Sequence, residues 1–122
     1  MSDIGFVILY VEEVARSAEF YSRLLEKPIV ESSATFAMIP AAPGLMLGLW
    51  RRDGVAPKAT GGPGASEIAV PLADAAAVDA SHALWSAQAP IAQPPTKLDF
   101  GYTFVALDPD GHRVRVFAPA SD

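Results

Sequence analysis

The sequence predicts an α+β fold built from two similar βαβββ modules. The order strand, helix and three short strands occurs twice, and a segment rich in glycine and proline separates the two copies. Matched positions in the copies also recur at a nearly constant spacing. At 122 residues, the chain has the usual length of one domain. We therefore expect a single domain over residues 1–122, with module one at 1–50, a connector at 51–65 and module two at 66–119.

The first module begins with a stretch of β-branched and aromatic residues at 4–11, which is typical of a buried strand. Apolar residues then recur at helical spacing, and Pro28 is expected to end that helix. The helical stripe consists of Val14, Ala18, Tyr21 and Leu25. Three short strands should follow, at residues 29–33, 35–39 and 45–50, with a loop of Pro40, Pro43 and Gly44 between the last two.

The same order restarts after the connector. Residues 67–72 are typical of a strand, and Asp74 is expected to cap an alanine-rich helix at 75–88. The remaining expected elements are a short strand at 91–93, a loop at 94–99 and two strands at 103–107 and 113–117. The last two strands form a hairpin around residues 108–111, because Asp first, Pro second and Gly last fit a tight turn.

Matched positions relate the two modules to each other. Val11 and Leu72 are 61 positions apart. Toward the end of each module the spacing is 67, as in Gly44 with Gly111, Leu47 with Val114 and Trp50 with Phe117. The change from 61 to 67 implies a small insertion, chiefly at 95–102. Because neither half could bury its sheet alone, we expect the two modules to pack together.

Composition limits the possible partners. Apolar residues make up 51% of the chain and charged residues 19%, which predicts a packed core. The net charge of −5, with no run of Lys or Arg, disfavours nucleic acid and anionic membranes as partners. No cysteine is present, which excludes disulfides, thiolate zinc sites and cysteine nucleophiles. Since the sequence shows neither a signal peptide nor a run approaching the ~18 apolar residues of a membrane span, we expect a cytoplasmic protein.

Each sheet is predicted to have one aliphatic face and one mixed face, because side chains alternate along a strand. The mixed face of strand 45–50 carries Met46, Gly48 and Trp50, and that of strand 113–117 carries Arg113, Arg115 and Phe117. The aliphatic residues between them should pack on the helices. An apolar surface with a few polar groups is typical of a small-molecule cavity, so the mixed faces are the candidate binding surfaces.

Three stretches of the sequence resemble one known family. They are residues 11–21 (VEEVARSAEFY), 65–74 (ASEIAVPLAD) and 108–117 (DPDGHRVRVF). Together with the duplicated element order, they resemble the vicinal oxygen chelate superfamily, also called the glyoxalase/bleomycin-resistance/dioxygenase fold. The resemblance covers nearly the whole chain and implies two βαβββ modules that form cupped mixed sheets.

The resemblance also implies where a metal would be bound. Metal enzymes of this superfamily take their ligands from the first and last strands of each module, and the matching positions here are Phe6, Gly48, Glu67 and Arg115. Phe and Gly offer no ligand atom in the side chain, and Arg stays cationic. We therefore expect no metal and no cofactor. The sequence instead resembles the metal-free members, which bind and sequester antibiotics or other small molecules.

Aromatic and polar residues are the candidates for ligand contact. The expected set is Trp50, Phe36, Tyr10, Met46, Glu67, Tyr102, Phe104, Arg115 and Phe117. Trp50 is the best single candidate, because it lies on a mixed face beside the glycine-rich connector. Burial in the core is an equal alternative for any one aromatic residue. A bulge within 35–39 would also turn Phe36 and Met38 to the other face.

Other suggestive residues have structural interpretations. We expect His82, on the second helix, and His112, in the final turn, to lie at the surface. Asp108 and Asp110 are expected to form the hairpin turn, because the spaced ligands of a calcium loop are missing. Trp85 is expected in the core of the second module.

Two functional hypotheses follow from different classes. The first is a metal-free protein that binds a small, planar, largely apolar molecule, with drug sequestration as the biological use. The alternative is a glyoxalase-type lyase or isomerase with a replacement for the metal, and a purely structural module with a filled cup is a third possibility. The resemblance also implies a homodimer, since modules of two chains commonly complete each other's cup in this superfamily.

Glu67 and Arg115 are expected to lie near each other, because they match the metal positions of the second module. Pairing is predicted since a buried charge without a partner is costly. The planar fork of Arg115 suits a carboxylate. The alternative is that Arg115 points at the ligand and donates to a carbonyl or an anion.

Overall fold

The computed structural model describes residues 3–120. The chain divides into two compact units, Met1–Gly61 and Gly62–Asp122. The division falls inside the connector expected at 51–65.

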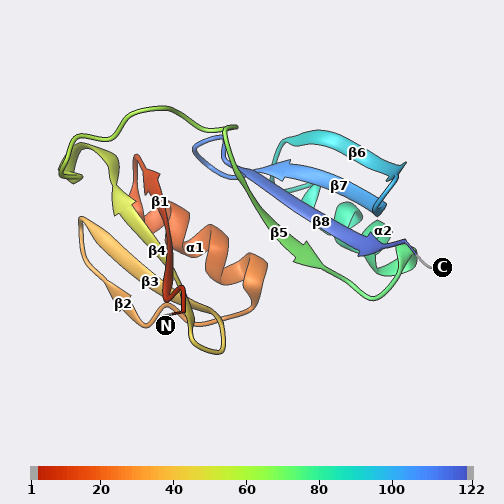
Figure 1. The fold of residues 1–122 in the computed structure, drawn as a ribbon, viewed down its shortest axis with the longest axis horizontal. Coiled ribbons are helices and arrows are strands. Elements are labelled where there is room, and N and C mark those ends of the chain that lie inside the picture. The colour runs from red at the N-terminus through yellow and green to blue at the C-terminus, as the bar shows by residue number, and fades with distance from the viewer. Residues whose placement is uncertain (1–2, 121–122) are drawn as a thin grey trace. The chain divides into compact units, whose positions relative to one another are not determined.

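Unit 1 contains one helix and a four-stranded sheet (Figure 1). Its elements are β1 (Phe6–Val11), α1 (Val14–Leu25), β2 (Glu31–Ser32), β3 (Phe36–Ala42), β4 (Leu45–Arg51) and the 3₁₀ turn η1 (Arg52–Gly54). The strand order is β1-β4-β3-β2, in which β1 is parallel to β4 and the other neighbours are antiparallel.

Unit 2 repeats this architecture. Its elements are β5 (Glu67–Pro71), α2 (Ala75–Trp85), β6 (Ile91–Leu98), β7 (Gly101–Leu107) and β8 (Arg113–Pro119). The strand order β5-β8-β7-β6 is the equivalent of that in unit 1, with β5 parallel to β8. The structure thus confirms the α+β fold and the two βαβββ modules.

The repeat extends to the residue register of the parallel strands. In unit 1, Ile8 lies opposite Gly48, and in unit 2 Ala69 lies opposite Arg115. The members of these pairs are related by the spacings of 61 and 67 found in the sequence. Positions inferred to be equivalent from the sequence are therefore equivalent in the sheets.

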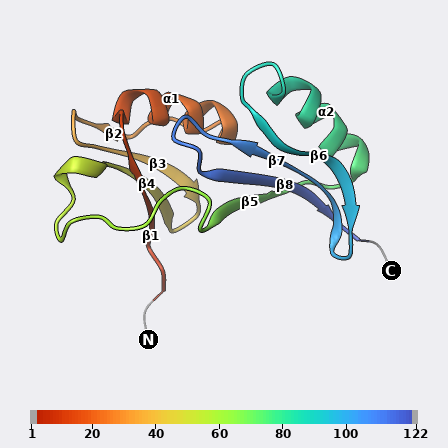
Figure 2. The ribbon, with the colours of Figure 1, turned by 90° about the horizontal axis from the view of Figure 1, so that it is seen from above.

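Each helix covers one face of its own sheet (Figure 2). The inward side of α1 consists of Val14, Ser17, Ala18 and Tyr21, all buried, against β3 and β4. Val78 and Trp85 of α2 are buried against the sheet of unit 2, as expected for Trp85. The aliphatic side chains of the strands alternate into these cores, as Ala37, Ile39, Leu47 and Leu49 do in unit 1.

Local side chains determine where several elements begin and end. The carboxylate of Asp74 accepts a hydrogen bond from the Ala77 backbone N–H at 2.9 Å, which caps α2 as predicted. The carboxylate of Asp108 accepts from the backbone N–H groups of Asp110 and His112 at 2.9 and 2.8 Å. These bonds, with Gly111 at φ +90°, form the predicted turn between β7 and β8.

The main departure from the sequence prediction is β6. Residues 94–99 were expected to form a loop, but the strand runs from Ile91 to Leu98 through Pro94 and Pro95. β6 is the edge strand of its sheet, and its register shifts between Gln93 and Thr96. An edge position and a bulge are where a strand accepts prolines, because no ladder hydrogen bond is lost there.

Smaller departures concern the second strand of unit 1 and the second helix. β2 is limited to Glu31–Ser32, although Val30 still donates to the Met38 carbonyl at 3.0 Å. Pro40 belongs to β3 instead of a loop, beside a register shift between Pro40 and Ala42. α2 ends at Trp85, before the predicted end of 88. Among residues 3–120, no helix is both long and apolar enough to cross a membrane.

Candidate functional site

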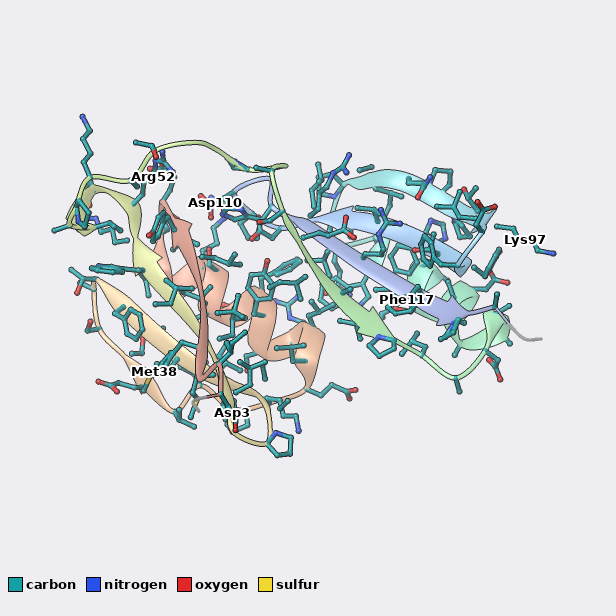
Figure 3. The ribbon with its side chains drawn as sticks, in the orientation of Figure 1. Asp3, Met38, Arg52, Lys97, Asp110 and Phe117 are labelled. Carbon is teal, nitrogen blue, oxygen red and sulfur yellow. The ribbon has the colours of Figure 1, made fainter. Side chains whose placement is uncertain are left out.

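The face of the unit 1 sheet opposite α1 is aromatic and apolar; we call it open face 1. It consists of Phe6, Ile8, Tyr10, Phe36, Met38, Pro40, Met46, Gly48 and Trp50. The register places these residues together, since paired residues of neighbouring strands share a face. The structure shows which face each side chain of β3 takes. Phe36 and Met38 lie on open face 1, and Met38 is labelled in Figure 3. Ala37 and Ile39 are buried in the core. The register shift in β3 comes after these residues and leaves their faces unchanged.

Three aromatic rings gather at one end of open face 1. Trp50 lies opposite Tyr10 on one side and Phe36 on the other. The rings of Tyr10 and Trp50 meet edge to face, with centroids 6.2 Å apart and planes at 80°. Edge-to-face pairs are stable arrangements of aromatic rings. All three residues remain partly exposed, so aromatic surface is accessible from solvent at this end of open face 1.

Gly48 lies against the ring of Phe36, which leaves little room for a side chain at this position. A Cβ at Gly48 would be 2.9 Å from Cζ of Phe36 and 3.2 Å from Cγ1 of Ile8. Both distances are shorter than ordinary contacts between carbon atoms. The ring of Phe36 therefore fills the space into which a side chain at this metal-equivalent position would project.

The corresponding face of unit 2, open face 2, contains an ion pair. Nε of Arg115 donates to Oε2 of Glu67 at 2.6 Å, and Nη2 donates to Oε1 at 3.3 Å. Nη1 donates to Oγ1 of Thr103 at 3.3 Å. Thr103 is fully buried and donates in turn to the Val116 carbonyl at 3.0 Å. The predicted pairing of Glu67 with Arg115 is confirmed, and Thr103 is a further partner that the sequence did not indicate.

Aromatic rings border this ion pair. The guanidinium carbon of Arg115 lies 5.6 Å from the centre of the Phe100 ring, within the range of a cation–π contact. Phe100 also meets Phe117 edge to face, with centroids 5.9 Å apart, and Phe117 is labelled on β8 in Figure 3. Phe100 is 46% exposed although it is a large apolar residue. Sequence reasoning missed Phe100, because it lies in the turn before β7.

Tyr102 and Phe104 do not belong to open face 2. They alternate with Thr103 on β7 and point to the side of the sheet that α2 covers. Phe104 is fully buried against the ring of His82, at 5.3 Å between centroids. Tyr102 and Phe104, two of the candidates for ligand contact, therefore lie on the face opposite to Phe117, and for Phe104 the alternative of burial in the core holds. His82 likewise packs on the core and is only partly exposed.

Tyr102 has a structural partner on the helix. Its hydroxyl donates to Oδ1 of Asp79 at 2.7 Å. This hydrogen bond to a carboxylate raises the pKa of Tyr102 above its usual value of 10.0, with smaller contributions from desolvation and from the negative charge of Asp79. The bond joins β7 to α2 on the face away from the ion pair.

The four metal-equivalent positions do not fit a divalent metal. Phe6 has no ligand atom, and the position of Gly48 is covered by the Phe36 ring. Both oxygens of Glu67 contact the guanidinium of Arg115, a cation that would repel a metal ion. Within residues 3–120, no three His, Asp or Glu side chains gather in a group that could hold a metal.

The two βαβββ units have the same strand order, and in each a helix covers one face of the sheet. This architecture defines the fold class of the protein. The chain belongs to the vicinal oxygen chelate superfamily, the glyoxalase/bleomycin-resistance/dioxygenase proteins. No protein-family model matches the sequence.

Individual proteins similar to this chain narrow the comparison further. The chain is 32% identical to the phenazine antibiotic resistance protein EhpR of Enterobacter agglomerans over 114 residues, which cover 89% of this chain and 86% of that protein. It is similar in structure to protein ATC0852 from Agrobacterium tumefaciens, with a TM-score of 0.86, 45% identity and coverage of 99% and 100% of the two chains. A glyoxalase/bleomycin resistance protein/dioxygenase family enzyme from Burkholderia phytofirmans shares the fold at a TM-score of 0.81 and 16% identity, over 98% of this chain and all of that one.

Proposed function

We propose that the protein binds a small, planar, largely apolar molecule without a metal. Any protection against that molecule would come from its sequestration. The observation that carries this proposal is the aromatic cluster of Tyr10, Phe36 and Trp50 on open face 1. The Phe36 ring of this cluster occupies the space next to Gly48, the position at which metal-dependent members of the superfamily would carry a metal-binding side chain.

Exposure of open face 1 supports a binding role. Phe6 is 48% exposed and Ile8 is 41% exposed, next to the partly exposed aromatic rings. Contiguous apolar surface of this kind is uncommon on a monomer and is typical of interaction sites. A planar ring system could cover this surface, gaining both burial of apolar area and ring–ring contacts.

The relative EhpR supports the class of ligand. Its name describes resistance to a phenazine antibiotic. Phenazines are planar, tricyclic and aromatic, which matches the ligand expected from the side chains of open face 1. We therefore propose phenazines as the first ligands to test. The glyoxalase-type lyase or isomerase is not favoured, because its metal chemistry would need the positions now taken by Phe6, Gly48 and the Glu67–Arg115 pair.

A titration with phenazine tests the proposal. We expect binding by calorimetry, with quenching of the fluorescence of Trp50, while Trp85 stays buried in the core. Trp50→Ala should weaken binding by about 5- to 150-fold, since stacking of one ring is worth about 1–3 kcal/mol. Leu84→Ala is the matched control, because Leu84 is an exposed apolar residue on α2. Equal affinity of wild type and Trp50→Ala would reject open face 1 as the binding surface.

We further propose that the protein is a homodimer that acts in the cytoplasm. β1 is an edge strand with exposed apolar side chains, including Val7 and Ile8. Such an edge is a ready surface for association. Light scattering at micromolar concentration should give the mass of two chains, whereas the mass of one chain would contradict the dimer. Fractionation of cells tests the location.

A further inference from the structure

We infer that open face 2 selects ligands with a neutral polar substituent, in which a carbonyl stands beside an N–H or O–H donor, over ligands with a carboxylate. A carboxamide on a planar aromatic ring is the simplest such group. The inference rests on the proposed function and adds to it a second contact surface, on unit 2, for the same class of planar ligand. It concerns the group formed by Glu67, Arg115, Phe100 and Phe117.

The donors of Arg115 are only partly used. Two contacts go to Glu67 and one goes to Thr103. A guanidinium carries more N–H groups than these three contacts occupy, and it has no acceptor. The side chain of Arg115 is 17% exposed, so a ligand could reach its remaining N–H groups. A ligand carbonyl would provide an acceptor for them.

Glu67 provides the complementary group. Its side chain is 32% exposed, and an ionised carboxylate accepts hydrogen bonds at more sites than the two contacts with Arg115 use. A donor and an acceptor are thus presented side by side. A carboxamide has the reverse arrangement, with a carbonyl for Arg115 and an N–H for Glu67.

Charge decides between a carboxamide and a carboxylate. Arg115 is already neutralised by Glu67 through two contacts. A carboxylate on the ligand would lie near the negative charge of Glu67, in a chain whose net charge is −5. It would also compete with Glu67 for the same N–H groups. A neutral substituent has neither disadvantage.

The adjacent rings supply the apolar part of the surface. Phe100 is exposed at the turn before β7 and contacts both Arg115 and Phe117. The hydrogen-bonding pair and the aromatic edge therefore come from unit 2 alone. A substituted planar ring can contact both at once.

Three matched ligands test the inference: phenazine, phenazine-2-carboxamide and phenazine-2-carboxylate. The 2-position keeps the substituent away from the ring nitrogens, so no internal hydrogen bond forms. Calorimetry at a pH where the acid is ionised should show the carboxamide binding about tenfold or more tightly than the carboxylate, which corresponds to about 1.4 kcal/mol. Glu67→Gln should reverse the order, because Arg115 then carries an uncompensated charge.

Two further variants keep the test decisive. The double variant Glu67→Leu with Arg115→Met removes both charges and should abolish the preference for the carboxamide. It tests the inference independently, should the Glu67→Gln variant fail to fold. Lys97→Met is the control, because Lys97 is an exposed cation of the same sheet whose register partner Tyr102 places it on the face away from the ion pair. It should leave the order of affinities unchanged.

The outcomes separate the inference from the proposed function. Binding of all three ligands with equal affinity, or an unchanged order in the double variant, would overturn the inference and leave the proposed function standing. Failure of all three ligands to bind would overturn both.

Discussion

The two open faces share one topology but differ in chemistry. Open face 1 is apolar and aromatic, whereas open face 2 contains a hydrogen-bonded ion pair bordered by two phenylalanines. Equivalent positions make the contrast direct, since Gly48 in one unit corresponds to Arg115 in the other. A duplicated scaffold can therefore carry two surfaces of different chemistry, because the strand register fixes where a side chain lies but not which residue type it is.

The largest expected effect comes from breaking the ion pair. Arg115→Met should lower the free energy of unfolding by about 2–3 kcal/mol, less than the about 3–5 kcal/mol of a fully buried pair, because Glu67 is partly exposed. A double-mutant cycle with Glu67→Leu should give a clear coupling energy and recover part of the loss. Thermal and denaturant unfolding provide the values.

An exposed pair provides the control for that experiment. Arg51 and Asp53 also form an ion pair, but their side chains are 47% and 70% exposed. Arg51→Met should therefore change stability by about 0–1 kcal/mol. A coupling energy near zero for Glu67 and Arg115 would show that their pairing contributes nothing to stability.

The next effect concerns the aromatic face. Gly48→Ala should destabilise unit 1 by about 1–3 kcal/mol, because the new methyl group would overlap the Phe36 ring. Phe36→Leu in the same chain should restore much of the loss. Gly5→Ala is the control, since nothing lies within 4 Å of a Cβ at Gly5. An unchanged free energy of unfolding in Gly48→Ala would mean that the Phe36 ring does not occupy this space.

The smallest effect is the titration of Tyr102. Its pKa is raised, so the folded state holds the proton more tightly than the unfolded state does. The stability from this group is present below the usual tyrosine pKa and is lost as the pH rises through the raised value. Asp79→Asn should move the titration toward the usual value, as followed by ultraviolet difference spectroscopy with Tyr102→Phe as the blank. An unchanged midpoint would contradict the assignment to Asp79.

Much of the fold was predictable from the sequence. The spacings of 61 and 67 correctly related the parallel strands, and alternation correctly assigned the faces of β4 and β8. The pairing of Glu67 with Arg115 followed from the family resemblance, because both residues match metal positions of the second module. These predictions succeeded because each of those strands carries clearly different residues on its two sides.

Each failure of the sequence predictions has its own physical reason. β7 is apolar on both sides, so alternation could not show that Thr103, and not Phe104, faces the ion pair. Phe100 lies in a turn, where no periodicity marks the direction of a side chain. Pro94 and Pro95 are ordinary loop signals, and only the edge position of β6 makes them compatible with a strand.

The central claim is that an aromatic surface, and not a metal, holds the ligand. The most direct test is calorimetric titration with phenazine before and after exhaustive chelation of the same preparation. We predict the same affinity in both titrations, and the same loss of affinity in Trp50→Ala with or without the chelator. A loss of binding on chelation that added zinc or nickel restores would contradict the claim.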